Sequence, residues 1–390
     1  MSLLAVVELA ALVLGGVAWL LTYTVHSTVL LGAAWALVRG RVVRGEAAAD
    51  ALWKAAALGG VVTATVQTAL GLHPLAGRIP LPVAGPMGIR TLRVTQMPSG
   101  VPVSRTWFEP GPILPLAVRA VALAVLVAWI AIAAVRVTRL ARAHLRLRRC
   151  LAGRREVTGE PARTLAALLG ARGPRGVRLT CSDLLPGPVA LGRAEICLPT
   201  RVLAELPEAE LHAILAHEAA HLLRRDPLWL NVLTAVACVF AFQPLNALAL
   251  RRFREGAELL CDGWAVRATG RPAALARSIV RVAGWMTDVA ARAPLPAMVE
   301  GGSPFVARVQ RLAAHRGDPP MDGSRFGGAW VPLLLAAVLA AAPSIAPPRR
   351  MPPVRFDVDR EITIRRGMDP ARRTIDPAIL PLPRPRRPQR

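Results

Sequence analysis

Long apolar runs separated by arginine-rich segments dominate the N-terminal part of the chain. Four runs come close to or exceed the ~20 residues that one bilayer crossing requires. They extend over Leu3–Val38, about Ala55–Leu72, about Ile113–Val135 and Ala329–Ala346. The first run is long enough for one long span or a broken one. This pattern predicts a mainly α membrane protein with about four transmembrane helices.

The first apolar run contains a cluster of polar side chains, namely Thr22, Thr24, His26, Ser27 and Thr28. Polar groups inside the hydrocarbon region need partners, and neighbouring helices commonly supply them. We therefore expect these side chains to form hydrogen bonds between helices rather than to line a substrate path.

Arginines after the first and third runs predict the orientation of the protein. Arg39, Arg41 and Arg44 follow the first run, and six arginines between residues 136 and 149 follow the third. Cytoplasmic loops retain Lys and Arg during insertion, so both segments are expected in the cytoplasm. The predicted parts are a membrane region with three transmembrane helices, a cytoplasmic domain, a final transmembrane helix and a tail, over residues 1–138, 139–328, 329–347 and 348–390.

The predicted tail is rich in proline and arginine and contains too few apolar residues to form a core, so it is expected to be largely disordered. A strand is expected only over Val354–Ile364. The tail carries 12 arginines against five acidic residues, and such a charge disfavours export across the membrane. Either the tail crosses in spite of its charge, or the last apolar run does not span.

The composition agrees with a membrane protein and narrows its partners. Apolar residues make up 53% of the chain, and 49 basic against 25 acidic residues leave a formal charge of +24. Direct nucleic-acid binding is not expected, because seven Phe and one Tyr provide no interleaved aromatic platforms. Membrane lipid with anionic headgroups is the expected partner. The five cysteines contain no C-x-x-C pair, which argues against a disulfide framework or a Cys-only zinc site.

The clearest chemical motif lies on a predicted helix with marked ends. Pro207 suits its first position, and Pro227 stops it. His217 and His221 are four residues apart, so they project from one face and can hold one Zn²⁺. Glu218, next to the first histidine, is placed to take a proton from metal-bound water.

A catalytic zinc site also needs a third protein ligand and an open position for water. Glu258 is the best candidate for that ligand, and Glu255 is the competing choice. Asp262 lies four residues after Glu258 and on the same helical face, where it can accept a hydrogen bond from the second nitrogen of a ligand histidine. Cys261 is expected to be a small buried hydrophobic residue turned away from that face.

The apolar segment Leu228–Leu250 between these motifs constrains the topology. One continuous helix over this segment would reach ~34 Å, enough to cross the hydrocarbon. Glu258 would then lie across the membrane from His217, and the metal site could not form. Pro244, preceded by Gln243, indicates a helix break. We therefore predict a hairpin that folds back without spanning, either buried in the domain or dipped into the bilayer.

Together these motifs resemble the BlaR/MecR-type membrane metallopeptidases, best known from bacterial beta-lactam sensor-transducers. The matching elements are residues 210–221, 224–229 and 254–262. Residues 188–199 also match, and they resemble the strand pair that precedes the zinc helix in that family. The resemblance covers roughly residues 10 to 345.

The resemblance implies a cytoplasmic α+β gluzincin-like metalloprotease domain in a multi-pass protein of the bacterial inner membrane. It implies Zn²⁺ as the cofactor, with His217, His221 and Glu258 as ligands and Glu218 as the base. The chain departs from the sensor members after its last apolar run, because the tail is too short for a penicillin-binding domain and the chain has no S-x-x-K sequence. Beta-lactam sensing is therefore not implied.

The expected function is that of a membrane-embedded zinc-dependent endopeptidase acting in signal transduction. Its expected partner is a cytoplasmic or membrane-proximal regulatory protein, with a transcriptional repressor as the candidate substrate. Two alternatives stay open. One is a housekeeping or prenyl-protein-type membrane metalloprotease, and the other is a non-catalytic transmembrane receptor or scaffold with a structural zinc site. The sequence indicates no oligomeric state.

Overall fold

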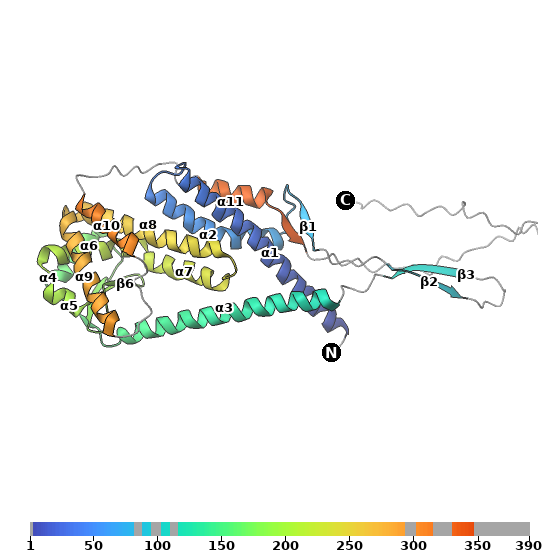
Figure 1. The fold of residues 1–390 in the computed structure, drawn as a ribbon, viewed down its shortest axis with the longest axis horizontal. Coiled ribbons are helices and arrows are strands. Elements are labelled where there is room, and N and C mark those ends of the chain that lie inside the picture. The colour runs from blue at the N-terminus through green and yellow to red at the C-terminus, as the bar shows by residue number, and fades with distance from the viewer. Residues whose placement is uncertain are drawn as a thin grey trace, which may run out of the picture. The chain divides into compact units, whose positions relative to one another are not determined.

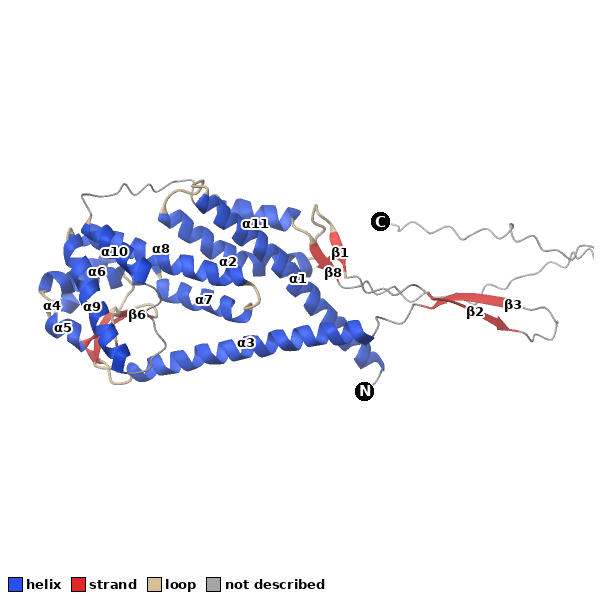
Figure 2. Cartoon of the chain, viewed as in Figure 1, coloured by secondary structure: helices blue, strands red, loops and turns tan. Residues whose placement is uncertain are grey.

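The computed structural model describes residues 3–81, 88–94, 103–109, 116–292, 302–314 and 330–346. These residues are mainly helical and include short strands (Figure 1 and Figure 2). The predicted tail, with the strand expected over Val354–Ile364, lies outside the described residues.

The first two helices form a close hairpin. α1 (Leu3–Arg39) is one unbroken helix of 37 residues, and α2 (Glu46–Ala69) returns beside it (Figure 1). Their backbones approach closely at Gly60, where a Cβ atom would lie 2.9 Å from Ser27 Cα. Small residues at such positions allow apolar helices to pack tightly in a membrane.

The polar cluster of α1 makes the predicted hydrogen bonds between segments. His26 Nδ1 lies 2.9 Å from Thr63 Oγ1 of α2. Thr22 Oγ1 accepts a hydrogen bond from the backbone N–H of Ile345. The expectation that this cluster joins neighbouring segments is confirmed for these side chains.

α3 (Leu116–Cys150) is a single helix of 35 residues, about 52 Å long at 1.5 Å per residue. It is longer than one crossing requires, and it continues without a break through the arginine-rich segment. Its apolar side chains are largely exposed, among them Val121, Leu123, Val125, Val127, Ile130 and Ile132. An exposed apolar helix surface as large as this one is typical of contact with lipid.

Two helices among the described residues are long and apolar enough to cross a membrane, Leu12–Arg39 within α1 and Ala120–Cys150 within α3. The other two predicted spans correspond to α2 and to α11 (Trp330–Ala341). α11 has 12 residues, so it reaches only about 18 Å. The structure supports a membrane protein but does not confirm four transmembrane helices.

Part of the segment between the second and third apolar runs forms strands. β1 (Arg78–Pro80) pairs in parallel with β8 (Ser344–Ala346), which follows α11. β2 (Gly88–Val94) and β3 (Val103–Glu109) form an antiparallel pair. The β-branched residues in β2 and β3 favour strands.

A four-stranded sheet lies in the part of the chain that carries the zinc motif. Its strand order is β4-β5-β7-β6, with β4 at Arg155–Glu156, β5 at Arg178–Ser182, β6 at Val189–Leu191 and β7 at Glu195–Pro199. β5 and β7 are parallel, whereas the other neighbouring pairs are antiparallel. The strand pair expected over residues 188–199 is confirmed as β6 and β7.

Six helical elements pack with this sheet or with one another around two hydrophobic clusters. They are α4 (Glu160–Leu169), the 3₁₀ turn η1 (Gly170–Arg172), α5 (Thr200–Glu205), α6 (Glu208–Arg224), α9 (Pro272–Arg292) and α10 (Gly302–Ala313). Ile196 and Leu198 of β7 share a hydrophobic cluster with Leu215 of α6. The sheet and its helices therefore hold the zinc-motif helix by burial of its apolar side chains.

The segment between the two halves of the motif folds back as predicted. α7 (Asp226–Val239) ends before the break, and α8 (Pro244–Thr269) begins after it and packs against α7. At the tip, Gln243 Nε2 donates to Ser27 Oγ and Thr28 Oγ1, each at 2.9 Å. Asn246 Nδ2 donates to the hydroxyl of Tyr23 at 2.7 Å. The hairpin tip thus docks against the middle of α1, and the chain returns toward α6.

Candidate metal centre

α6 is fixed at both ends by charge and backbone conformation. Pro207, which was predicted at the first helical position, lies at the N-cap, one residue before the helix begins. Glu210 near the start of the helix forms ion pairs with Arg277 and Arg281 of α9. At the other end Arg225 adopts a left-handed conformation with φ 59°. This residue ends α6 and lets α7 begin at once with Asp226.

Three donor groups converge where α6 and α8 pack together. His217 Nε2 and His221 Nε2 are 3.2 Å apart. The carboxylate of Glu258 lies 3.6 Å from His217 Nε2 and 3.7 Å from His221 Nε2. Ligand atoms of a tetrahedral zinc ion with bonds of 2.0–2.1 Å would be roughly 3.3–3.4 Å apart. The donor set and its spacing therefore fit Zn²⁺. His217, His221 and Glu258 supply the three protein ligands of such a site.

Each histidine has a carboxylate at its second nitrogen. His217 Nδ1 lies 3.0 Å from Asp262 Oδ1 on α8. His221 Nδ1 lies 2.9 Å from Asp226 Oδ2 at the start of α7. A carboxylate in this position holds the proton on Nδ1 and leaves Nε2 free to bind a metal. Both Nε2 atoms are thus oriented toward the same point.

Asp226 was not among the residues that the sequence singled out for the centre. It follows His221 by five residues and lies beyond the end of α6, so helical spacing does not place it near the ring. The left-handed turn at Arg225 brings it back. Burial by itself would raise the pKa of Asp226, but the hydrogen bond with His221 and the charge of Arg224 lower it, so its carboxylate is anionic.

Arg308 of α10 is the second residue that sequence reasoning missed. Its guanidinium donates two hydrogen bonds to Asp262, Nε to Oδ2 and Nη2 to Oδ1, each at 2.8 Å. Its Nη1 also pairs with Glu258 Oε2. A planar guanidinium can hold two carboxylates in a fixed arrangement. No local motif surrounds this arginine, so only the fold connects it to the centre.

These ion pairs set the pKa values of the centre. Burial by itself would lower the pKa of His217, but the neighbouring carboxylates of Asp262 and Glu258 outweigh that effect and raise the pKa to about 10. Burial would raise the pKa of Glu258, whereas the nearby imidazole of His217 and the charge of Arg308 hold the pKa well below its ordinary value. The pKa of Asp262 is lowered for the same reasons. Both carboxylates are therefore anionic at neutral pH, the form that binds a metal.

The donor cluster is partly open to solvent. The side chains of His217 and His221 are 8% and 15% exposed, whereas that of Glu258 is 37% exposed. A catalytic metal site needs such an open side for water and substrate. Glu218 lies on α6 directly after His217 and is buried.

Glu255, the competing choice for the third ligand, is engaged elsewhere. Its two carboxylate oxygens pair with Arg251 at 2.8 Å and with Arg252 at 3.0 Å. It lies one turn before Glu258 on α8 and does not take part in the donor cluster. The geometry therefore favours Glu258.

Cys261 is buried as expected, but it is not turned away from the centre. Its Sγ atom lies 3.3 Å from His221 Nδ1 and 3.5 Å from Asp226 Oδ2. The expectation failed because a residue three positions after Glu258 stays on the same side of a helix. The thiol contacts the Nδ1 side of His221, away from the convergent Nε2 atoms. Burial raises its pKa well above the ordinary value, so the thiol stays protonated.

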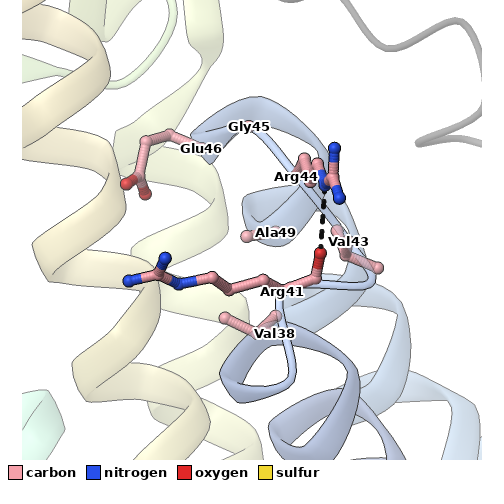
Figure 3. Close-up of a pocket in the computed structure, with 7 residues that line it drawn as sticks. All are labelled: Val38, Arg41, Val43, Arg44, Gly45, Glu46 and Ala49. Carbon is pink, nitrogen blue, oxygen red and sulfur yellow. Dashed lines mark hydrogen bonds between the residues drawn. The ribbon is translucent and has the colours of Figure 1, made fainter.

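A separate cavity lies at the turn between α1 and α2 (Figure 3). It has a volume of about 490 Å³ and is lined by Val38, Arg41, Val43, Arg44, Gly45, Glu46 and Ala49. Arg44 Nε donates to the backbone carbonyl of Arg41 across it. None of its lining residues belongs to the donor cluster.

Comparison with known proteins gives one family match. Residues 108–309 match the family described as BlaR1 peptidase M56. The matched range contains the three donor residues, Glu218 and the two carboxylates that face the histidines. The strand and helix elements from α3 to α9 lie within the matched range, which ends inside α10.

A curated relative is Protease HtpX homolog 1 of Streptomyces coelicolor (strain ATCC BAA-471 / A3(2) / M145). It is 32% identical to this chain over an alignment of 151 residues, and the match covers 28% of this chain and 49% of the relative. The chain thus spans about half the length of the curated relative that it matches.

Proposed function

The chain belongs to the BlaR1 peptidase M56 family, and from this membership we propose that it is a membrane zinc endopeptidase. In this proposal His217, His221 and Glu258 hold Zn²⁺, and Glu218 is the general base. The observation that carries it is the convergence of three donor groups from α6 and α8, with a carboxylate behind each imidazole. A structural zinc site usually has four protein ligands, whereas three with an open side is the arrangement of a catalytic one.

The chain's own residues perform the remaining chemistry. Zinc, when bound, polarises a peptide carbonyl and lowers the pKa of its water. Glu218 would accept a proton from the attacking water as its oxygen bonds to the peptide carbonyl carbon, and would return the proton to the amine nitrogen as the C–N bond breaks. Asp226 and Asp262 keep the imidazoles in the tautomer that leaves Nε2 available. Arg308 fixes Glu258 and Asp262 relative to each other.

The proposed substrate is a cytoplasmic or membrane-proximal regulatory protein, with a transcriptional repressor as the candidate. The family resemblance supports this substrate, and the arginine-rich segments after α1 and α3 support a protease domain on the cytoplasmic side. In such a multi-pass arrangement the centre would act close to the inner leaflet.

A housekeeping membrane metalloprotease is the second candidate, because the curated relative is named as a protease HtpX homolog. The two candidates differ in breadth. A housekeeping enzyme would cut many damaged membrane proteins, whereas a signalling enzyme would cut one regulatory protein at one bond. Mass spectrometry of membranes and cytosol from cells with active or inactive enzyme would distinguish them. A non-catalytic receptor with a structural zinc site is disfavoured by the intact Glu218.

The direct test uses the full chain purified in detergent, with Glu218→Gln as the variant. We expect the variant to keep its zinc and to lose cleavage of fluorescent casein, because only the base is removed. Glu208→Gln, on an exposed position of the same helix, is the matched control and should keep both zinc and cleavage. Equal cleavage by Glu218→Gln and wild type would remove Glu218 from its proposed role.

A further inference from the structure

A chain of largely buried ion pairs connects the α1–α2 hairpin to the candidate metal centre. It begins at Asp50, near the start of α2, whose side chain is only 7% exposed. Asp50 Oδ2 accepts from Lys54 Nζ at 2.7 Å and from Arg224 Nη2 at 3.1 Å. A carboxylate so buried is stable only when it is paired, so both contacts hold Asp50 in place.

The same guanidinium reaches the centre. Arg224 lies at the end of α6, and its Nε donates to Asp226 Oδ2 at 3.0 Å. That carboxylate oxygen is also the one 2.9 Å from His221 Nδ1. One arginine thus bridges a carboxylate of α2 and the carboxylate that faces a proposed metal ligand.

Lys54 anchors α2 to the helices that follow the centre. Its Nζ lies 5.1 Å from the ring centre of Trp229 on α7 and 5.0 Å from that of Phe253 on α8. These distances are typical of cation–π contacts. α2 also packs along both α7 and α8 (Figure 1). The start of α2 is therefore held against the elements that carry Asp226 and Glu258.

We propose that Asp50 is a positioning residue of the metal centre, through which the α1–α2 hairpin controls the orientation of His221. Asp50 holds Arg224, Arg224 holds Asp226, and Asp226 fixes the imidazole. A displacement of α2 relative to α6 breaks the Asp50–Arg224 contact and loosens the carboxylate behind His221. The inference rests on the proposed function, because it assigns regulation to the same centre.

The first test is Asp50→Asn in the full chain in detergent, because asparagine keeps the shape and removes the charge. We expect zinc affinity, measured by competition with a chelator, to fall on the order of tenfold, the low end of what outer partners of metal ligands contribute. The visible spectrum of the Co²⁺-loaded protein should also change. Asp50→Glu should restore much of the affinity. Asp183→Asn, which removes an exposed pair with Arg155, is the matched control and should leave zinc affinity unchanged.

A double-mutant cycle shows whether Asp50 acts through Asp226. In an Asp226→Asn background, Asp50→Asn should cause no further loss of zinc affinity. A purely structural role would lower the unfolding temperature but leave zinc affinity and the Co²⁺ spectrum of the folded protein at wild-type values. That result, or an equal loss in both backgrounds, would overturn the inference while leaving the proposed function intact. A wild-type chain that binds no zinc would instead overturn the proposed function, and this inference with it.

Discussion

Each histidine ring of the centre has a different neighbour at each of its two nitrogen atoms. The Nε2 atoms of His217 and His221 converge on one point, and each Nδ1 atom faces a carboxylate. The first arrangement follows from helical spacing and is visible in the sequence. The second needs a partner for each ring, and only one of the two partners, Asp262, has helical spacing that identifies it. A left-handed turn at Arg225 places Asp226 beside His221. Such turns favour glycine, so an arginine at this position does not predict one.

Removal of Arg308 should weaken the centre without removing a ligand. In Arg308→Met, Asp262 and Glu258 lose their shared cation, so both carboxylates become less well placed. We expect a loss of about 10–100-fold in zinc affinity or activity. Arg308→Lys should rescue little, because an ammonium cannot form the two parallel hydrogen bonds to Asp262. Arg311→Met, one turn later and exposed, is the control. Wild-type zinc affinity in Arg308→Met would show that the arginine does not position the carboxylates.

Zinc binding should strengthen as the pH rises through the neutral range. The pKa of His217 is raised to about 10, so its imidazole is protonated below that pH, and zinc must displace the proton. For one displaced proton, the apparent affinity rises about tenfold per pH unit. Chelator competition between pH 6 and pH 8 measures this slope. Asp262→Asn removes a carboxylate that raises the pKa, so its slope should be shallower. A flat profile in the wild-type chain would contradict the assigned protonation.

At the scale of elements, the α7–α8 hairpin decides whether the centre can form. Pro244 and the polar Gln243 beside it predict a helix break, and the structure confirms that break between α7 and α8. The sequence also indicates where the hairpin tip can dock, because the polar residues within the first apolar run need hydrogen-bond partners. It does not reveal which partner each one takes, since the contact joins residues more than 200 positions apart.

The docking of the hairpin tip can be tested at Gln243. In Gln243→Ala, the tip loses its hydrogen bonds to Ser27 and Thr28, each contributing about 0.6 kcal/mol within a membrane bundle. We expect a lower thermal unfolding temperature, corresponding to about 1 kcal/mol, and weaker zinc binding because α8 carries Glu258. Gln310→Ala, at an exposed position of α10, should change neither quantity. An unchanged Gln243→Ala protein would show that the tip does not hold the hairpin.

The elements around the centre were predictable to different degrees. The ends of α6 were marked by Pro207 and Pro227, and the helix begins one residue after the first proline and ends three residues before the second. The position of α10 was not predictable, because Arg308 follows Asp262 by 46 residues and an intervening helix sets its direction. The short α11 also differs from the long apolar run that suggested a span, since β8 pairs with β1 and ends the helix early.

At the scale of the whole molecule, the N-terminal hairpin and α11 pack together with the helices of the metal-centre region. One hydrophobic cluster contains buried residues of α1, α2, α7, α8 and α11. α3 continues across the predicted boundary at residues 138 and 139 without a break, so that boundary divides a helix rather than two separate structures. The predicted domain division stays a prediction. This packing places the α1–α2 hairpin against α7 and α8, which carry Asp226 and Glu258.

The central claim is that two distant stretches of the chain meet at one zinc ion through Glu258. The most direct measurement is the zinc affinity of the full chain with Glu258→Gln, set against Glu255→Gln one turn earlier on the same helix. We expect Glu258→Gln to lose more affinity than the 10–100-fold that an outer partner contributes, and Glu255→Gln to bind zinc as the wild type does. Wild-type affinity in Glu258→Gln, or a large loss only in Glu255→Gln, would contradict the account.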